Sequence, residues 1–507
     1  MKSQRVLYLF LVFCLTSCST LHSNPAQTAE QPGPTASLES MVQVKEHESL
    51  ARAYLAQNNY LESVKQRIVL EKILPNETDR QANRRQLWST LNLLSLDNVS
   101  DAFLQARDNP ELAGWLNLAM IYQELGEQQQ GLTTALARWR SQYPAHPANA
   151  LLPGNFSEIQ LNQPKTIALL LPLTGPLADA GNSVRNGFMD AYYTKEKSQT
   201  DNTRVKVYDT NQGDIRQLYS QAVSNGADFV IGPLDKERVA TLAESRVVSV
   251  PTIALNYLPD PNMNGGPRFY QFGLSPVDEA VQVALKARGA GHQKALIIAP
   301  NNAWSNTVVQ AFTQEFQRSG GRVVTQITYA NSNNLNELIR DSLLIPSSTQ
   351  RAQVLKNSLR ENFKFVPRRR QDVDMVFMLA SPVMGRQIKP FLQFHYAGDL
   401  PVYSTSMIYT GQANRMKDTD LNDIQFPDIP WVLQQHKGTG GNARLYALGH
   451  DAFKLSQQIT LLSNTPQMGL QGLTGELYLS GQNYISRQLR WATFQQGVPQ
   501  LMKGHVA

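Results

Sequence analysis

Apolar and polar positions follow two different periods along this chain. Over residues 45–150, apolar side chains recur three and four positions apart, with short breaks and no convincing strand between them. After residue 164, short apolar runs alternate with segments of helical period. The first pattern predicts an all-α domain and the second predicts an α/β domain. The stretch at 151–164 contains Pro153, Gly154 and Pro164 and is expected to be a linker.

The helical segment repeats itself. Tyr54, Trp88 and Tyr122 lie 34 residues apart at each step. Prolines that we expect to end helices keep nearly the same interval, at Pro75, Pro110 and Pro144. A helix-turn-helix unit of about 34 residues is the tetratricopeptide period. We therefore expect a TPR-like array, which would bind another protein or a polymer, or else an irregular bundle that acts only as a spacer.

The region 165–507 has the order of elements that builds a parallel sheet. Apolar runs with strand character lie at 167–171, 205–208, 229–231, 251–255, 295–298, 323–327, 375–379 and 402–404. Stretches of helical period separate many of them, at 183–193, 215–225, after Pro233, and at 280–286, 307–318 and 385–394. This alternation predicts a doubly wound parallel sheet. Because the pattern pauses near Phe272 and then resumes, we expect two lobes with a cleft between them.

The start of the chain has the features of a secretion signal. Lys2 and Arg5 precede an apolar run at 6–15, which is shorter than the roughly 20 residues that span a bilayer as a helix. The ending Leu15-Thr-Ser-Cys18 resembles the bacterial lipobox, in which the cysteine is lipidated and becomes the new N-terminus. We therefore expect a signal peptide at 1–17 and a lipid anchor on Cys18, with an ordinary signal peptide as the alternative.

The residues after Cys18 suggest how the protein is held at a membrane. Residues 18–44 begin with a stretch rich in Ser, Thr, Gln and Pro, which predicts a disordered tether. In the lipoprotein-sorting systems that this start resembles, Asp in the next position retains a protein at the inner membrane. Ser19 therefore favours the periplasmic face of the outer membrane.

Composition and charge exclude several kinds of chemistry. Cys14 and Cys18 are the two cysteines of the sequence, so no disulfide, catalytic thiol or cysteine-based metal site is expected after residue 18. The formal charge of +6 falls to +4 when Lys2 and Arg5 leave with the signal. A charge this small over such a length does not indicate a nucleic-acid-binding protein. The histidines are scattered singly, and the sequence contains no Ser-x-x-Lys, Gly-x-Ser-x-Gly or His-Glu-x-x-His motif. We predict no cofactor, no metal and no catalytic residue.

Several motifs then point to a family. The segments Leu171–Gly181 and Val230-Ile-Gly-Pro-Leu234 resemble the opening of the type I periplasmic-binding fold of branched-chain amino-acid receptors. The segments 368–377, 401–406 and 420–431, together with the lipobox and the helical repeats, resemble the LpoA family. Members of that family are outer-membrane lipoproteins that activate class A penicillin-binding proteins, the bifunctional peptidoglycan synthases.

The resemblance implies a function and a set of partners. It implies a non-enzymatic activator that binds an inner-membrane class A penicillin-binding protein and thereby regulates transpeptidation. The outer membrane, through the lipid anchor, and peptidoglycan are the other expected partners. A solute-binding lipoprotein for amino acids or muropeptides is the first alternative, and a cell-wall hydrolase is the second.

Two groups of residues are candidates for binding. Ligands of open α/β sheets lie beyond the carboxyl ends of the strands. The residues expected there are Leu173, Thr174, Gly175, Asn256, Tyr257, Ser404, Thr405 and Ser406. Backbone amides of the Thr174–Gly175 turn would hold a carboxylate, and the hydroxyls would complete the site. The alternative is that all of these are turn and helix-cap residues of the fold.

The second candidate is a basic cluster, Arg368-Arg369-Arg370. It would contact an acidic surface of the partner or the carboxylates of peptidoglycan, or it is a solvated loop. The nearby acidic residues Asp372 and Asp374 are expected to form structural ion pairs with it and not to act in catalysis.

Overall fold

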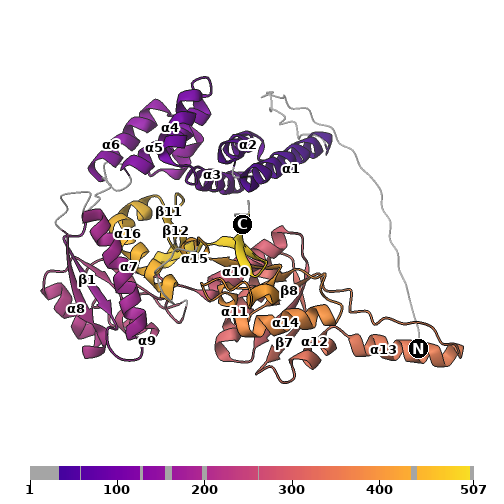
Figure 1. Cartoon of the computed structure of the whole chain (residues 1–507). Coiled ribbons are helices and arrows are strands. Elements are labelled where there is room, and N and C mark those ends of the chain that lie inside the picture. Colours follow the sequence, from indigo (N-terminus) through magenta and orange to yellow (C-terminus); the bar gives the residue numbers. More distant parts are fainter. Residues whose placement is uncertain are drawn as a thin grey trace, which may run out of the picture.

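The computed structural model describes residues 34–57, 59–125, 129–154, 163–196, 203–260, 262–434 and 442–502. A helical domain lies across one side of a two-lobed α/β region (Figure 1). The predicted signal peptide, Cys14, Cys18 and Ser19 lie outside the described residues. Within the described residues, no helix is both long enough and apolar enough to cross a membrane.

The helical domain contains consecutive helices that pack against one another, α1 on α2, α2 on α3, α4 on α5 and α5 on α6. Its described helices are α1 (Pro34–Ala56), α2 (Tyr60–Ile73), α3 (Glu77–Leu91), α4 (Leu96–Gln105), α5 (Pro110–Leu125) and α6 (Gln129–Gln142). The repeated aromatic positions meet in space, because the rings of Trp88 and Tyr122 pack edge to face with centroids 5.2 Å apart. Trp115 and Ala119 are fully buried beside them.

Two expectations about this domain were wrong in detail. The tether was expected to continue to residue 44, but α1 already begins at Pro34, since proline is well suited to the first turn of a helix and an alanine- and leucine-containing run follows. Pro110 was expected to end a helix, but it is the first residue of α5. The missing N–H of proline costs nothing at that position, so the same residue can start a helix.

The first lobe is built on a sheet with the order β11-β12-β13-β5-β4-β3-β1-β2. Its strands are β1 (Thr166–Leu171), β2 (Arg204–Asp209), β3 (Phe229–Ile231), β4 (Thr252–Ala254), β5 (Phe269–Phe272), β11 (Leu470–Gly472), β12 (Gly475–Ser480) and β13 (Tyr484–Gln488). The helices α7 (Ala178–Glu196), α8 (Ile215–Ser224) and α9 (Lys236–Glu244) follow the first strands in alternation.

The second lobe has a sheet with the order β15-β14-β10-β9-β8-β6-β7. Its strands are β6 (Lys294–Pro300), β7 (Arg322–Tyr329), β8 (Met375–Met378), β9 (Val402–Tyr403), β10 (Ile424–Asp428), β14 (Arg490–Gln495) and β15 (Val498–Leu501). The helices between residues 276 and 433 are α10 (Pro276–Gly289), α11 (Ala303–Arg318), α12 (Leu335–Ser342), α13 (Ile345–Leu359), α14 (Pro382–Phe394) and α15 (Pro430–Leu433).

The expected strands and helices are all present, but the sheets are not wholly parallel. The pairs β11/β12, β12/β13, β10/β14 and β14/β15 are antiparallel. Short connections such as 473–474 and 496–497 cannot carry a crossover, so they force neighbouring strands to run in opposite directions. The C-terminal part of the chain thus adds an antiparallel edge to each parallel sheet.

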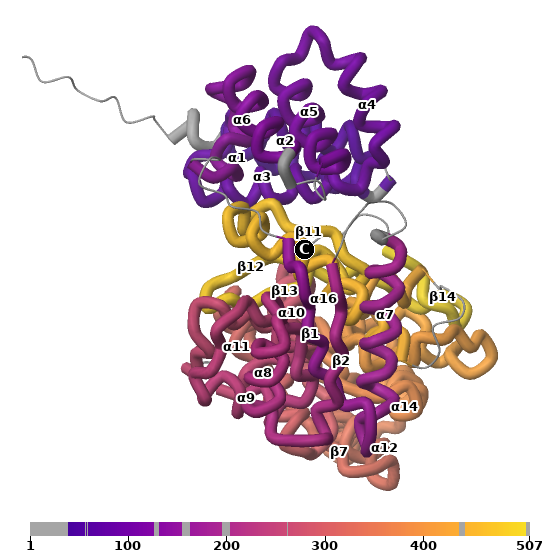
Figure 2. The backbone as a smooth tube through the Cα atoms, turned by 90° about the vertical axis from the view of Figure 1, so that its left-hand side faces the viewer, coloured from indigo at the N-terminus to yellow at the C-terminus, as the bar shows by residue number. Residues whose placement is uncertain are grey.

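The long helix α16 (Ala443–Asn464) carries the chain back to the first lobe, where it packs along α7 (Figure 2). Two glycines permit this approach. A Cβ atom at Gly449 would lie 1.9 Å from the carbonyl oxygen of Val184, and one at Gly187 would lie 1.8 Å from that of Tyr446. The first lobe is therefore completed by residues 443–488, which come between β10 and β14 of the second lobe in the chain.

Candidate functional site

The expected cleft residues fall into separate groups. The Thr174–Gly175 turn lies after β1, and Gly175 has the positive φ of 70° that favours glycine. Its neighbours already bind an internal carboxylate: the Leu173 amide donates to Asp209 Oδ1 at 2.9 Å, and the Thr174 hydroxyl donates to Asp209 Oδ2 at 2.7 Å. These groups therefore hold Asp209 in the place where we expected a ligand carboxylate.

Asn256 and Tyr257 form the second group, after β4. The Asn256 amide donates to the carbonyl of Leu234 at 3.2 Å. The Tyr257 hydroxyl lies 2.9 Å from the carbonyl oxygen of Ile485, and its ring stacks on Tyr484 with centroids 4.3 Å apart. Burial raises the pKa of Tyr257 to about 12. Tyr257 thus joins β4 to β13 within the first lobe.

The third group, Ser404 to Ser406, follows β9 in the second lobe. The Ser404 hydroxyl donates to the carbonyl of Met378 at 2.6 Å. The hydroxyl of buried Thr405 has no hydrogen-bond partner among the described residues. Ser406 donates twice to Glu279, from its amide at 2.8 Å and from its hydroxyl at 3.0 Å.

Two adjacent carboxylates at the start of α10 link this group to the second one. Asp278 accepts from the Tyr484 hydroxyl of the first lobe at 2.6 Å, whereas Glu279 accepts from Ser406 of the second lobe. Burial raises the pKa of Glu279 to about 7, partly opposed by Arg487. The chain first crosses from one lobe to the other through α10. Its first turn therefore makes hydrogen bonds to both lobes, through Asp278 to the first and through Glu279 to the second.

An ion pair extends the same network. Arg444, at the start of α16, donates through Nε and Nη2 to fully buried Asp428 at 3.0 and 2.5 Å. It also donates to the carbonyl of Ser406 at 3.3 Å. Sequence reasoning missed Glu279, Asp428 and Arg444, because they are far apart in the sequence and no short spacing joins them.

The basic cluster is largely neutralised by acids of this chain. Arg369 pairs with Asp399 at 2.5 Å, and Arg370 pairs with Asp372 at 2.7 Å. The second pair is the structural role that we expected for Asp372. Asp374 instead accepts hydrogen bonds from the backbone amides at 293 and 294, at the start of β6. Arg368 is exposed, which leaves one arginine of the cluster open to solvent.

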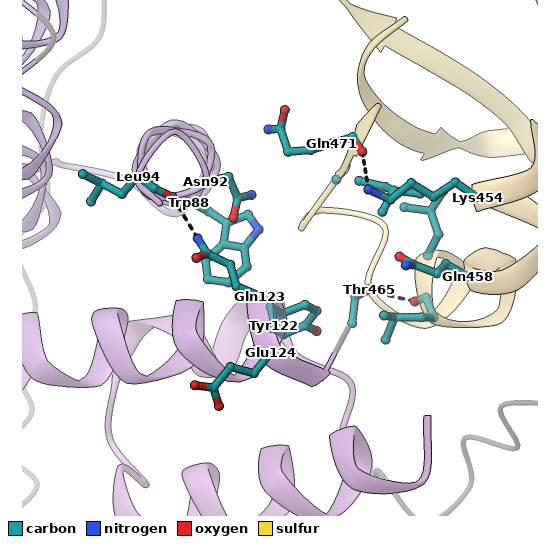
Figure 3. A pocket seen from close by; sticks show the side chains of 14 residues that line it. Trp88, Asn92, Leu94, Tyr122, Gln123, Glu124, Lys454, Gln458, Thr465 and Gln471 are labelled. Carbon is teal, nitrogen blue, oxygen red and sulfur yellow. Dashed lines mark hydrogen bonds between the residues drawn. The ribbon is translucent and has the colours of Figure 1, made fainter. Parts of the chain in front are cut away.

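A further cavity, of about 370 Å³, lies where the helical domain meets the first lobe (Figure 3). On one side are Trp88 and Tyr122, and on the other are α16 and β11, where Lys454 donates to the carbonyl of Gln471 at 2.8 Å. The indole N–H of Trp88 is buried and has no hydrogen-bond partner among the described residues. Sequence reasoning missed this cavity because its two walls are more than 300 residues apart in the chain.

The same junction has an apolar component. Leu461 of α16 and Met468, which follows it, are buried in the hydrophobic core that the helical domain forms around Trp88 and Trp115. Among the described residues, no group of three or more His, Cys, Asp or Glu side chains could hold a metal ion.

Two lobes joined by crossing segments, with an array of paired helices attached, define a periplasmic-binding-type scaffold that carries a helical-repeat domain. The model of the family described as "LppC putative lipoprotein" matches residues 17–497. The chain belongs to this family.

Known proteins share both parts of the structure. A relative from Photobacterium profundum, described as "Penicillin-binding protein activator LpoA", is 28% identical over 448 residues, which cover 85% of this chain and 72% of that protein. A relative of the same description from Haemophilus influenzae is 29% identical over 475 residues, which cover 89% and 75%. The crystal structure of full-length LpoA from Haemophilus influenzae is similar with a TM-score of 0.56 and 26% identity, covering 91% of this chain and 82% of that one.

Other solved structures match the α/β region. The C-domain of Haemophilus influenzae LpoA, described as "a regulator of PBP1A", has a TM-score of 0.53 and 26% identity and covers 66% of this chain and 99% of that one. A "putative branched-chain amino acid ABC transporter" from Chromobacterium violaceum has a TM-score of 0.50 and 25% identity, with 65% and 99% covered. The predicted combination of a TPR-like domain with a two-lobed periplasmic-binding-type domain is confirmed.

Proposed function

We propose that this protein binds and activates a class A penicillin-binding protein and so regulates peptidoglycan synthesis. One observation carries the proposal: the likeness to full-length LpoA extends over 91% of the chain and includes both domains. A solute receptor needs the two lobes alone, whereas this chain shares the added helical domain with proteins described as penicillin-binding protein activators. Activation requires that the protein bind the active state of the synthase more tightly than the inactive state.

We also propose where the protein is held, from its first residues. We propose that Cys18 carries the lipid and that Ser19 directs the protein to the outer membrane. A diacylglycerol with a further acyl chain is a stable anchor, whereas a single chain binds only marginally. The folded part would then reach across the periplasm, close to peptidoglycan, to a synthase in the inner membrane.

We also propose that the protein acts by binding alone and catalyses no reaction. The geometry of the expected cleft supports a scaffold over a solute receptor, because Leu173 and Thr174 hold Asp209 and Ser406 holds Glu279. Of the basic cluster, exposed Arg368 is the residue we propose for contact with the partner or with peptidoglycan carboxylates.

A binding and turnover assay tests the proposal. The mature protein would be mixed with a purified class A synthase and lipid-linked peptidoglycan precursor, and both binding and cross-linking would be measured. We expect a complex and a several-fold higher transpeptidation rate, with heat-denatured protein as the control. No complex and an unchanged rate would contradict the proposed function. Release of soluble muropeptides from purified sacculi by the protein alone would contradict the non-enzymatic part.

A further inference from the structure

The helices α1, α2 and α3 enclose a groove of about 600 Å³ that none of the proposed activities uses. These helices lie together at one end of the helical domain (Figure 1). Met41 and Val44 of α1 and Ile73 of α2 form an apolar part of its wall, and the Met41 side chain is 58% exposed. We call this feature the α1–α3 groove.

A buried guanidinium that makes no ion-pair contact with a described residue lines the α1–α3 groove. Arg67 is only 6% exposed, and it forms no ion pair with any described residue. Its Nη1 atom makes one long contact of 3.5 Å to Asn83 Oδ1, and its Nε atom has no hydrogen-bond partner among the described residues. Burial lowers the pKa of Arg67 to about 10, and the nearby charge of Arg52 lowers it as well, whereas the charge of Glu48 partly opposes both effects.

Arg84, on the neighbouring helix α3, shows how a buried arginine is otherwise accommodated. It is 7% exposed, and it donates to Glu71 at 2.7 Å and to Glu77 at 2.6 Å. A buried charge that lacks such partners is strongly destabilising. Arg67 has no carboxylate partner of this kind among the described residues.

The acidic residues on the groove wall have other partners. Glu48 pairs with Arg52 at 3.2 Å, and Asp79 accepts a hydrogen bond from the Asn76 amide at 2.8 Å. Lys45, at the exposed rim, adds a second positive charge. The groove thus combines unpaired positive charge with an apolar wall.

We propose that the α1–α3 groove binds the terminal carboxylate of a peptide whose last side chain is apolar. A chain end carries its carboxylate and its side chain on the same Cα atom. It can therefore place the anion on Arg67 while the side chain contacts Met41 and Val44. Guanidinium and carboxylate groups match in bidentate geometry, which supplies both affinity and direction. This site is independent of the proposed activation of a synthase.

The test compares two forms of one peptide on the full mature chain. Fluorescein-labelled Gly-Ala-Val-Leu with a free carboxylate and the same peptide with a terminal amide are titrated by fluorescence anisotropy. We expect the acid to bind at least ten-fold more tightly than the amide. Equal binding of both forms, or binding of neither, would overturn the proposal without any variant.

Variants then locate the site. Arg67→Met is expected to reduce the affinity for the acid to that for the amide while the unfolding midpoint stays the same or rises, because an unpaired buried charge is removed. Arg67→Lys keeps the charge and should retain part of the preference. Arg138→Met, an exposed cation on α6 that does not line the groove, is the matched control and should bind as the wild type does. Unchanged preference for the acid in folded Arg67→Met would assign binding to another place and overturn the proposal.

Discussion

The hydroxyl of Ser89 in the helical domain donates a hydrogen bond of 2.7 Å to Glu476 Oε2 on β12 of the first lobe, 387 residues away along the chain. Both side chains are buried, and burial raises the pKa of Glu476. Ser89 follows Trp88, which lines the cavity between the helical domain and the first lobe, so the two domains share a polar contact as well as an apolar core. Such a contact makes their relative position sensitive to single substitutions.

Replacing Ser89 with Ala should weaken the junction between the domains. The buried carboxyl group of Glu476 then loses a donor, which typically costs about 1 to 2 kcal/mol. We expect a lower urea midpoint and faster hydrogen exchange at β12 and α3. Ser220→Ala on α8, where the hydroxyl bonds only to the backbone of its own helix, is the control. An unchanged exchange rate at both elements would show that Ser89 does not hold the junction.

A methyl group at Gly449 should disturb the first lobe. It would lie 1.9 Å from the carbonyl oxygen of Val184, so α7 and α16 would have to separate. Overpacking of this kind costs about 2 to 3 kcal/mol. Thermal unfolding of Gly449→Ala should therefore begin well below that of the wild type. Gly289→Ala is the control, because no atom lies within 4 Å of its added methyl group and the residue ends α10. Equal midpoints for both variants would contradict the close packing.

The predictable part of the fold is the part in which local sequence and structure agree. The strand at 167–171 is a continuous apolar run, buried on both faces, and the 34-residue spacing of Trp88 and Tyr122 reflects contact between successive helices. The return of the chain to the first lobe could not be predicted in this way. This return depends on the close contact of Gly449 with α7, about 260 residues away in the chain. The spacing of apolar residues within a short segment contains no information about such a contact.

The candidate site was predictable in position but not in chemistry. The topology placed Tyr257 and Ser406 at strand ends, where polar side chains were expected. Their actual partners, Tyr484 and Glu279, come from other elements and leave their groups hydrogen-bonded within the protein. The unpaired charge of Arg67 was not visible in the sequence, because arginine in a helix is normally an exposed residue or one of an ion pair.

Replacing Glu279 with Gln should change how stability depends on pH. The pKa of Glu279 is raised from 4.5 to about 7, so its favourable contribution is fully present below about pH 4.5 and is lost as the pH rises through about 7. The variant stays neutral and can still bond to Ser406. We expect its unfolding midpoint to fall less than that of the wild type between pH 5 and pH 8. Asp278, whose pKa burial also raises, remains in both proteins and contributes equally.

The control for this measurement is Glu237→Gln, an exposed position in the first turn of α9. Its pH profile should follow that of the wild type over this range. Parallel curves for Glu279→Gln and the wild type would refute the role of Glu279 as a buried titrating group.

Arg444→Met should cause a large loss of stability. Asp428 is fully buried, and Arg444 supplies two hydrogen bonds and the balancing charge. Removing one partner of a buried ion pair typically costs about 3 kcal/mol or more, because the other charge remains without compensation. The double variant Arg444→Met with Asp428→Asn removes both charges and should recover part of the loss. Differential scanning calorimetry of the wild type and of both variants measures their unfolding temperatures. If the single variant unfolds at the wild-type temperature, or if the double variant recovers nothing, the pair does not hold the start of α16 against the second lobe.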